Sequence, residues 1–198
     1  MKRFATALTF LAACGAFGCN PALGQMPEER RIVKEVVVKA PPEAVFKAWS
    51  TSEGVATFFA PEARVEARPD GPFEVYMNPY GTPGMKGADD MRVLAVQENR
   101  MISFTWNAPP HLPLARAQRT FVVVRMQPEG AAETRVRLTH TGWGEGGEWD
   151  KAHAYFDRAW GNVMANLQKR FAEGPIDWTE WRARMKAATE EMARKAAK

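Results

Sequence analysis

The feature that most constrains the fold is a single long stretch of helical periodicity near the C-terminus. Between Glu148 and Glu173 apolar residues recur at intervals of three and four, and Gly174-Pro175 ends the pattern. The apolar positions are Trp149, Ala152, Phe156, Ala159, Trp160, Val163, Met164, Leu167 and Phe171. We predict one long amphipathic helix, which must cover the apolar face of the elements that precede it.

The segments before this helix alternate between apolar and polar residues, as strands with one buried face do. Ile32–Lys39 is rich in β-branched residues and predicts the first strand, and two short helices are expected over Glu43–Ser50 and Val55–Phe59. Further strands are predicted over 63–67, 73–77, 91–97, 101–107, 119–127 and 134–141. Strands with a single apolar face form an antiparallel sheet that is covered on one side only.

Together these elements predict an α+β fold in which a curved antiparallel sheet wraps round the long C-terminal helix. A curved sheet and a straight helix do not match along their whole length, so we expect a cavity between them. The loops Asn78–Ala88 and Ala108–Ala117 are apolar for surface loops. They fit an entrance to that cavity, and they also fit ordinary packing of loops on the body.

A further helix is expected over Asp177–Lys198, where Asp177 and Glu180 have the spacing of a capping box. Its apolar face consists of Trp178, Trp181, Met185, Ala188 and Met192. This face predicts that the helix folds back onto the body, and the alternative is an exposed helix that awaits a partner. We divide the chain into a leader (1–24), a folded domain (32–173) and a C-terminal helical extension (174–198).

The leader has the three-part pattern of a secretory signal peptide. Two basic residues precede an uncharged, mostly apolar run over Phe4–Gly18, and small residues precede Gly24. The run is short for a membrane-spanning helix. We expect cleavage after Gly24 and a periplasmic or secreted protein. The first alternative is a lipoprotein, because Leu11-Ala12-Ala13-Cys14 resembles a lipobox and would attach the chain to a membrane through Cys14, and the second is an unprocessed cytoplasmic chain.

Composition excludes several classes of function. The two cysteines, Cys14 and Cys19, lie in the leader, so the folded domain should contain neither a disulfide framework nor a cysteine-rich metal site. The formal net charge of +4 and the pI of about 9.2 suggest an acidic partner. The basic excess, however, lies in the leader and after Gly174, and the body between them is formally neutral. We therefore expect no nucleic-acid partner.

The three histidines, His111, His140 and His153, contain no i, i+4 pair and no accompanying carboxylate motif, so we expect no metal ion and no other cofactor. Strand alternation places His140 on the inward face together with Val136 and Leu138. His140 is either a strand-end histidine that is hydrogen-bonded to the backbone or a residue that contacts a ligand or transfers a proton. The sequence shows no nucleophile turn and no paired carboxylates, so we assign no catalytic residue.

Aromatic residues on the elements around the expected cavity are the candidate ligand contacts. Together with the inward-facing histidine they form the predicted binding set of Tyr76, Trp106, His140, Trp143, Phe156 and Trp160. Trp106 and Trp143 stand out because each lies where a strand runs into a loop. The competing interpretation for most members of this set is core packing.

Five stretches resemble the SRPBCC superfamily, the helix-grip fold of START lipid-transfer domains and birch-pollen-type allergens, and in particular its branch of activator of heat-shock protein 90 ATPase homologues. They are VVVKAPPEAVFKAWST (Val36–Thr51), DGPFEVYM (Asp70–Met77), VLAVQENRMISFTW (Val93–Trp106), VRLTHTGW (Val136–Trp143) and AWGNVMANLQKRF (Ala159–Phe171). This branch often ends its second short helix in tryptophan, where Phe58-Phe59 stand here. The resemblance implies the fold and a cavity, but no single reaction.

Three functions remain open. The first is binding of a small hydrophobic ligand, such as a lipid or an aromatic metabolite, in the cavity between sheet and helix. The second is an enzyme, cyclase-like or hydrolase-like, that uses the same cavity with His140 or a tyrosine as acid or base. The third is a co-chaperone-like interaction module, which the resemblance suggests and which requires that the leader is not cleaved.

Overall fold

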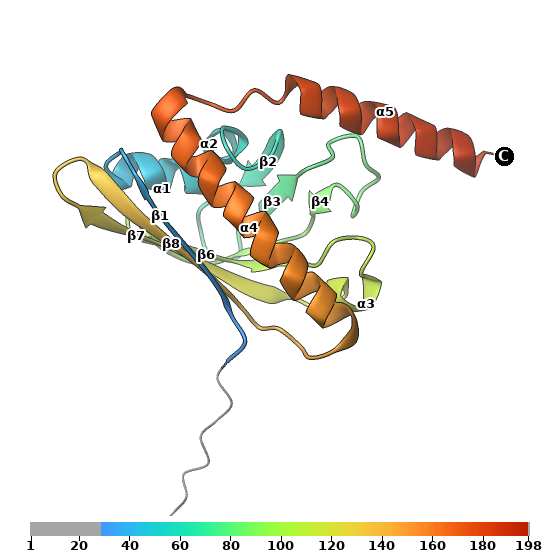
Figure 1. Cartoon of the computed structure of the whole chain (residues 1–198), viewed down its shortest axis with the longest axis horizontal. Coiled ribbons are helices and arrows are strands. Elements are labelled where there is room, and N and C mark those ends of the chain that lie inside the picture. The colour runs from blue at the N-terminus through green and yellow to red at the C-terminus, as the bar shows by residue number, and fades with distance from the viewer. Residues whose placement is uncertain (1–28, 198) are drawn as a thin grey trace, which may run out of the picture.

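The computed structural model describes residues 29–197, so the predictions about the leader, Gly24, Cys14 and Cys19 lie outside it. Within these residues the chain has the predicted α+β architecture. A curved antiparallel sheet is crossed by one long helix, and an extra helix follows at the C-terminus (Figure 1). No helix in this part of the chain is long and apolar enough to cross a membrane.

The main sheet has five antiparallel strands in the order β1-β8-β7-β6-β5. The strands are β1 (Ile32–Val38), β5 (Val93–Gln97), β6 (Met101–Trp106), β7 (Thr120–Glu129) and β8 (Glu133–Thr141). On one face the register sets buried residues opposite one another, such as Val124 and Leu138, while the other face carries exposed residues such as Arg125 and Arg137. One face is therefore buried and the other open, as the alternating pattern predicts.

The remaining strands form a second sheet of three strands in the order β2-β3-β4 rather than extending the first. They are β2 (Glu62–Val65), β3 (Phe73–Tyr76) and β4 (Gly87–Ala88). The prediction that Asn78–Ala88 is a loop throughout was wrong for its last two residues, because β4 pairs with β3 there. The second sheet forms a side wall next to the main sheet.

Two short helices, α1 (Pro42–Ser50) and α2 (Ser52–Ala56), follow β1. Their presence was predicted, but the bounds predicted for the second, Val55–Phe59, were wrong, because the Thr51 cap starts the helix three residues earlier and residues 57–59 form a turn. The Thr51 hydroxyl accepts a hydrogen bond from the Gly54 backbone N–H at 2.9 Å and thereby caps α2. A Cβ at Gly54 would lie 2.3 Å from the Lys47 carbonyl oxygen, so the close approach of the two helices requires glycine.

The long helix α4 (Gly147–Glu173) crosses the inner face of the main sheet diagonally (Figure 1), and its bounds agree with the periodic stretch to one residue. Its buried residues are Ala152, Phe156, Trp160, Val163, Met164 and Leu167. All of them except Ala152 belong to one core cluster with the inward side chains of the sheet and of α1 and α2. The apolar stripe of the helix and the apolar face of the sheet therefore bury one another.

The C-terminal helix α5 (Thr179–Ala196) runs from the end of α4 across the side on which the second sheet lies (Figure 1). The predicted capping box does not form, because Trp178 is the N-cap and the Asp177 side chain accepts from the Thr179 backbone N–H at 2.9 Å instead. On the predicted apolar face, Trp178, Trp181 and Met185 are half-buried, whereas Ala188 and Met192 are exposed. The helix thus contacts the body as far as Thr189, whose hydroxyl accepts a hydrogen bond from the Asn78 side-chain amide at 3.1 Å, and residues 190–196 are exposed.

Candidate functional site

An apolar pocket of about 400 Å³ lies along the flank of α4, and we name it the α4–α5 pocket. Its wall is built from the segment after α2, the end of β6, one side of α4, and Ile176, Trp178 and Trp181 of the C-terminal extension. Tyr155 is the only titratable side chain among its described lining residues. The expected position was between α4 and the sheet, but there the buried side chains of both form one core cluster.

Four packed aromatic rings form the inner wall of the α4–α5 pocket. Phe59, Trp106, Phe156 and Trp160 are all buried, with ring centroids 5.6 Å apart for Phe59–Trp106, 5.5 Å for Phe59–Trp160 and 5.2 Å for Trp106–Trp160. Rings at these distances attract one another through their quadrupoles as well as by burial of apolar area. Because each ring is held by its neighbours, this wall is formed before any ligand arrives.

The outer wall comes from the start of the C-terminal extension. The indole N–H of Trp178 donates to the Ala56 carbonyl at 2.7 Å, and that of Trp181 donates to the Met77 carbonyl at 2.6 Å. Both rings are half-buried. The two hydrogen bonds fix the orientation of the indoles and leave part of each ring at the pocket.

A second pocket of about 190 Å³ adjoins the first, and we name it the loop pocket. It shares Met77, Trp106, Tyr155 and Phe156 with the α4–α5 pocket, and its remaining wall comes from the loops 78–88 and 107–110. These are the loops that the sequence suggested as a cavity entrance. The second of them was predicted as a loop over Ala108–Ala117, but it contains a helical turn, α3 (Pro113–Arg116).

The guanidinium of Arg116 joins these two loops. It donates to the Ala108 carbonyl at 2.6 Å, to the Gly84 carbonyl at 2.7 Å and to the Gly87 carbonyl at 3.0 Å. It also lies 3.5 Å from the Asp89 carboxylate, and 13% of the Arg116 side chain and 10% of the Asp89 side chain are exposed. The rim of the loop pocket is therefore held by a largely buried, well-bonded charge pair.

His140 lies outside both pockets, in a closed hydrogen-bond network under α4. Its Nδ1 accepts from the Trp160 indole N–H at 2.8 Å, and its Nε2 lies 2.7 Å from the Thr120 hydroxyl. Because that hydroxyl donates to the Trp106 carbonyl at 3.2 Å, we assign the proton to Nε2, which donates to the Thr120 oxygen. The network therefore satisfies every polar group of the ring.

The environment of His140 keeps the imidazole neutral. The residue is fully buried, and burial, with a smaller contribution from the nearby His153, lowers its pKa to about 3. A proton acceptor at neutral pH needs a pKa near that pH and access to substrate, and His140 has neither. Its observed partners are side chains, where the sequence suggested a backbone partner.

Tyr76 and Trp143 also lie away from the lining of both pockets. The Tyr76 hydroxyl donates to the buried Glu74 carboxylate at 2.9 Å, and burial together with this hydrogen bond raises the pKa of Tyr76 to about 12. The Trp143 ring packs on His140 with centroids 4.2 Å apart, and its indole N–H donates to the His140 carbonyl at 3.0 Å. Of the six predicted contacts, the structure places Trp106, Phe156 and Trp160 together at the α4–α5 pocket.

One polar group in that shared wall lacks a partner. The indole N–H of Trp106 is buried and makes no hydrogen bond within the described residues. A buried unpaired donor costs free energy, of the order of 1–3 kcal/mol. The indole N–H of Trp49 is also buried without a hydrogen-bond partner among the described residues, but Trp49 lines neither pocket.

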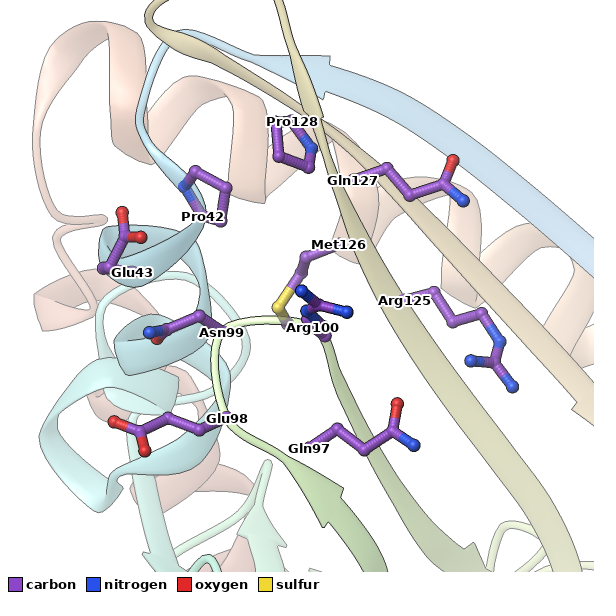
Figure 2. A pocket seen from close by; sticks show the side chains of 10 residues that line it. All are labelled: Pro42, Glu43, Gln97, Glu98, Asn99, Arg100, Arg125, Met126, Gln127 and Pro128. Atoms are coloured by element: carbon purple, nitrogen blue, oxygen red, sulfur yellow. The ribbon is translucent and has the colours of Figure 1, made fainter.

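Another depression lies at the far end of the main sheet, beside the start of α1 (Figure 2). Its volume is about 580 Å³, and its charged residues are Glu43, Glu98, Arg100 and Arg125. Figure 2 shows that these side chains point in different directions rather than toward one another, and all four are exposed. We therefore assign no site there. Residues 29–197 also contain no group of three histidine, cysteine or acidic residues that could hold a metal ion.

Comparison with solved structures places this fold in a known class. A protein from Mesorhizobium loti, MLL2253, superimposes with a TM-score of 0.60 at 20% identity, over 74% of this chain and 100% of its own. The Aha1 dimer from Colwellia psychrerythraea gives 0.56 at 18% identity, over 73% and 98%. An AHSA1-like protein from Rhizobium etli gives 0.52 at 20% identity, over 78% and 89%. The chain therefore shares the fold of these proteins.

The family, and with it the helix-grip fold of the SRPBCC superfamily, follows from the sequence match. The family described as activator of Hsp90 ATPase homolog 1-like protein matches residues 39–172, and the chain belongs to this family. A search of curated proteins finds no match. The matched residues end before Ile176, Trp178 and Trp181, so the outer wall of the α4–α5 pocket lies beyond the family match.

Those three residues are among the pocket residues that the sequence did not predict as ligand contacts. The signal was present, because Trp178 and Trp181 lie three residues apart on the apolar face of the predicted last helix. What the pattern could not supply was the surface on which that face docks. Phe59 was not predicted either, because in the sequence it stands out only as the place where the resembling branch often has a tryptophan.

Proposed function

We propose that this protein binds a small apolar molecule in the α4–α5 pocket, and that it does so as an exported protein cleaved after Gly24. The fold of the family supports ligand binding in general. The observation that carries the proposal is an open pocket of about 400 Å³ that is walled by packed aromatic side chains. Pockets of a few hundred Å³ with predominantly apolar walls are typical of small-molecule sites.

The wall chemistry favours binding over catalysis. An acid–base or nucleophilic mechanism needs a titratable or nucleophilic group that reaches the ligand, and the described lining of the α4–α5 pocket offers only Tyr155. The one buried histidine faces other side chains. The unpaired indole N–H of Trp106 could donate to an oxygen of the ligand, so we expect the molecule to carry a hydrogen-bond acceptor.

The test compares two alanines of α4. Ala159 lines the pocket, whereas Ala165 is exposed on the same helix and lines neither the α4–α5 pocket nor the loop pocket. We expect 1-anilinonaphthalene-8-sulfonate to bind the wild type with a saturable rise in fluorescence. Ala159→Phe should weaken this binding at least about tenfold, which corresponds to about 1.4 kcal/mol, because the added ring fills the pocket. Ala165→Phe should leave the affinity unchanged.

Two results would contradict the binding proposal. One is the absence of saturable binding to the wild type, and the other is an equal loss of affinity in Ala159→Phe and Ala165→Phe. Native mass spectrometry of protein purified without organic solvent adds an independent readout, since a bound molecule would appear as a fixed mass increment.

Export is tested separately by the mass of the mature N-terminus from cells that produce the full chain. A chain that begins at Gln25 supports export by a cleaved signal peptide. A lipid-modified Cys14 would assign the protein to a membrane as a lipoprotein, and an intact Met1 would reopen the interaction-module alternative.

A further inference from the structure

The C-terminal extension builds part of the α4–α5 pocket, although it lies beyond the residues that the family match covers. Three of its residues, Ile176, Trp178 and Trp181, line the same pocket as the four rings of the inner wall. The site of this protein is therefore composite. The domain that the family match covers supplies one side, and a segment beyond that match supplies the other.

The extension is attached at the pocket by specific polar contacts. The Ile176 N–H donates to the Thr57 carbonyl at 2.8 Å. Arg182, one turn into α5, donates to the Pro61 carbonyl at 2.6 Å and to the Glu62 carboxylate at 2.7 Å. No residue of α5 is fully buried. The helix is held by these contacts, by the two indole hydrogen bonds and by a hydrogen bond from the Asn78 side-chain amide to the Thr189 hydroxyl at 3.1 Å, rather than by a core of its own.

The docked extension presents flat aromatic surface. The rings of Trp178 and Trp181 lie 6.5 Å apart at an interplanar angle of 78°, and both are half-buried. The inner wall of the same pocket consists of Phe59, Phe156 and two further indoles. A flat aromatic ligand in this pocket would contact the faces or edges of rings from both walls. An alkyl chain has no ring quadrupole, so it cannot make these aromatic interactions.

We propose that Trp178 and Trp181 make the α4–α5 pocket selective for planar aromatic molecules over aliphatic ones. This inference rests on the proposed binding function and names the class of its ligand. The area of apolar surface alone would not produce such a preference, because an alkyl chain with the same number of carbons buries at least as much area. A preference for the flat molecule must come from the shape and the quadrupoles of the rings.

The experiment uses two methyl ketones with the same number of carbon atoms, 2-acetylnaphthalene and dodecan-2-one, as competitors of 1-anilinonaphthalene-8-sulfonate on the full chain. Both carry one carbonyl. The first has a planar aromatic ring system where the second has a flexible alkyl chain. The wild type should bind the aromatic ketone about tenfold more tightly. Trp181→Leu should reduce this ratio to about one, with little change for dodecan-2-one.

Two further variants separate selectivity from attachment of the helix. Trp181→Phe removes the N–H that donates to the Met77 carbonyl but keeps a ring, so it should retain most of the preference. Met192→Leu, at an exposed position of the same helix, should behave like the wild type. The inference is overturned by a wild type without preference, by a preference that survives in Trp181→Leu, or by equal loss in the Leu and Phe variants. If neither ketone nor the dye binds the wild type, the proposed function itself fails.

Discussion

Two neighbouring regions of this molecule treat their polar groups in opposite ways. Around His140, three side chains satisfy one another and leave nothing free. In the α4–α5 pocket, half-buried rings face an open space, and the Trp106 N–H in its wall has no partner. The two regions meet at Trp160, whose N–H is bonded to His140 and whose ring lines the pocket. The network therefore holds the Trp160 ring in the wall of the pocket in which we propose that a ligand binds.

The sharpest way to break this comparison is to remove the centre of the closed network. His140→Ala leaves the Trp160 N–H without its acceptor and opens a cavity under α4, so we expect a loss of about 3–5 kcal/mol in the free energy of unfolding. Urea denaturation followed by tryptophan fluorescence measures it. The exposed His111→Ala is the control and should change stability by less than about 0.5 kcal/mol. If His140→Ala is as stable as the control, the hydrogen-bond network does not stabilise the fold.

The next effect concerns the rim of the loop pocket. Arg116→Met should lower the free energy of unfolding by about 2–3 kcal/mol, because three loop carbonyls lose a charged donor and the Asp89 carboxylate loses its partner. Arg119→Met is the matched control, since Arg119 is exposed and donates to a single carbonyl. Thermal unfolding of both variants gives the comparison. Equal stability of the two variants would show that the loops do not depend on Arg116.

Acid should destabilise the folded protein through His140. His140 has an ordinary pKa of 6.5 when unfolded and a pKa of about 3 in the folded protein, so the unfolded chain binds the extra proton between these values. The free energy of unfolding is therefore not reduced by His140 above about pH 6.5. Below that pH it falls by up to about 1.4 kcal/mol per pH unit. His140→Gln keeps a donor and an acceptor without titrating, and it should show a shallower loss between pH 6 and pH 4 in urea titrations. The same slope in wild type and variant would contradict the assignment.

Much of the fold was predictable because its determinants are local and periodic. The intervals of three and four over Glu148–Glu173 predicted α4, and strand alternation correctly placed His140 on the inward face. The capping box at Asp177 failed because the Asp177 carboxylate bonds to Thr179, two residues on, and helix α5 begins later. Propensity and spacing do not decide between such local alternatives.

The candidate site was less predictable because it depends on docking. Trp106, Phe156 and Trp160 lie on the apolar faces of a strand and a helix, and a pattern can indicate that such residues are buried. It cannot indicate that Phe59 packs between them, nor that Trp178 and Trp181 reach the carbonyls of Ala56 and Met77 more than a hundred residues earlier. Long-range contacts of this kind come from tertiary packing. A short segment of sequence carries no information about them.

The smallest expected effect tests whether the extension behaves as a separate, weakly held part of the site. Arg182 is partly exposed and joins α5 to Glu62 and Pro61, so Arg182→Gln should leave global stability nearly unchanged. Local opening of α5 should become easier, and hydrogen exchange of its backbone amides should accelerate about two- to fivefold while the amides of α4 keep their rates. Lys186→Gln, at an exposed position on the same helix, should leave the exchange rates of the α4 and α5 amides unchanged. If the amides of wild-type α5 exchange only at the rate of global unfolding, the extension is part of the core, and its contrast with the closed network around His140 disappears.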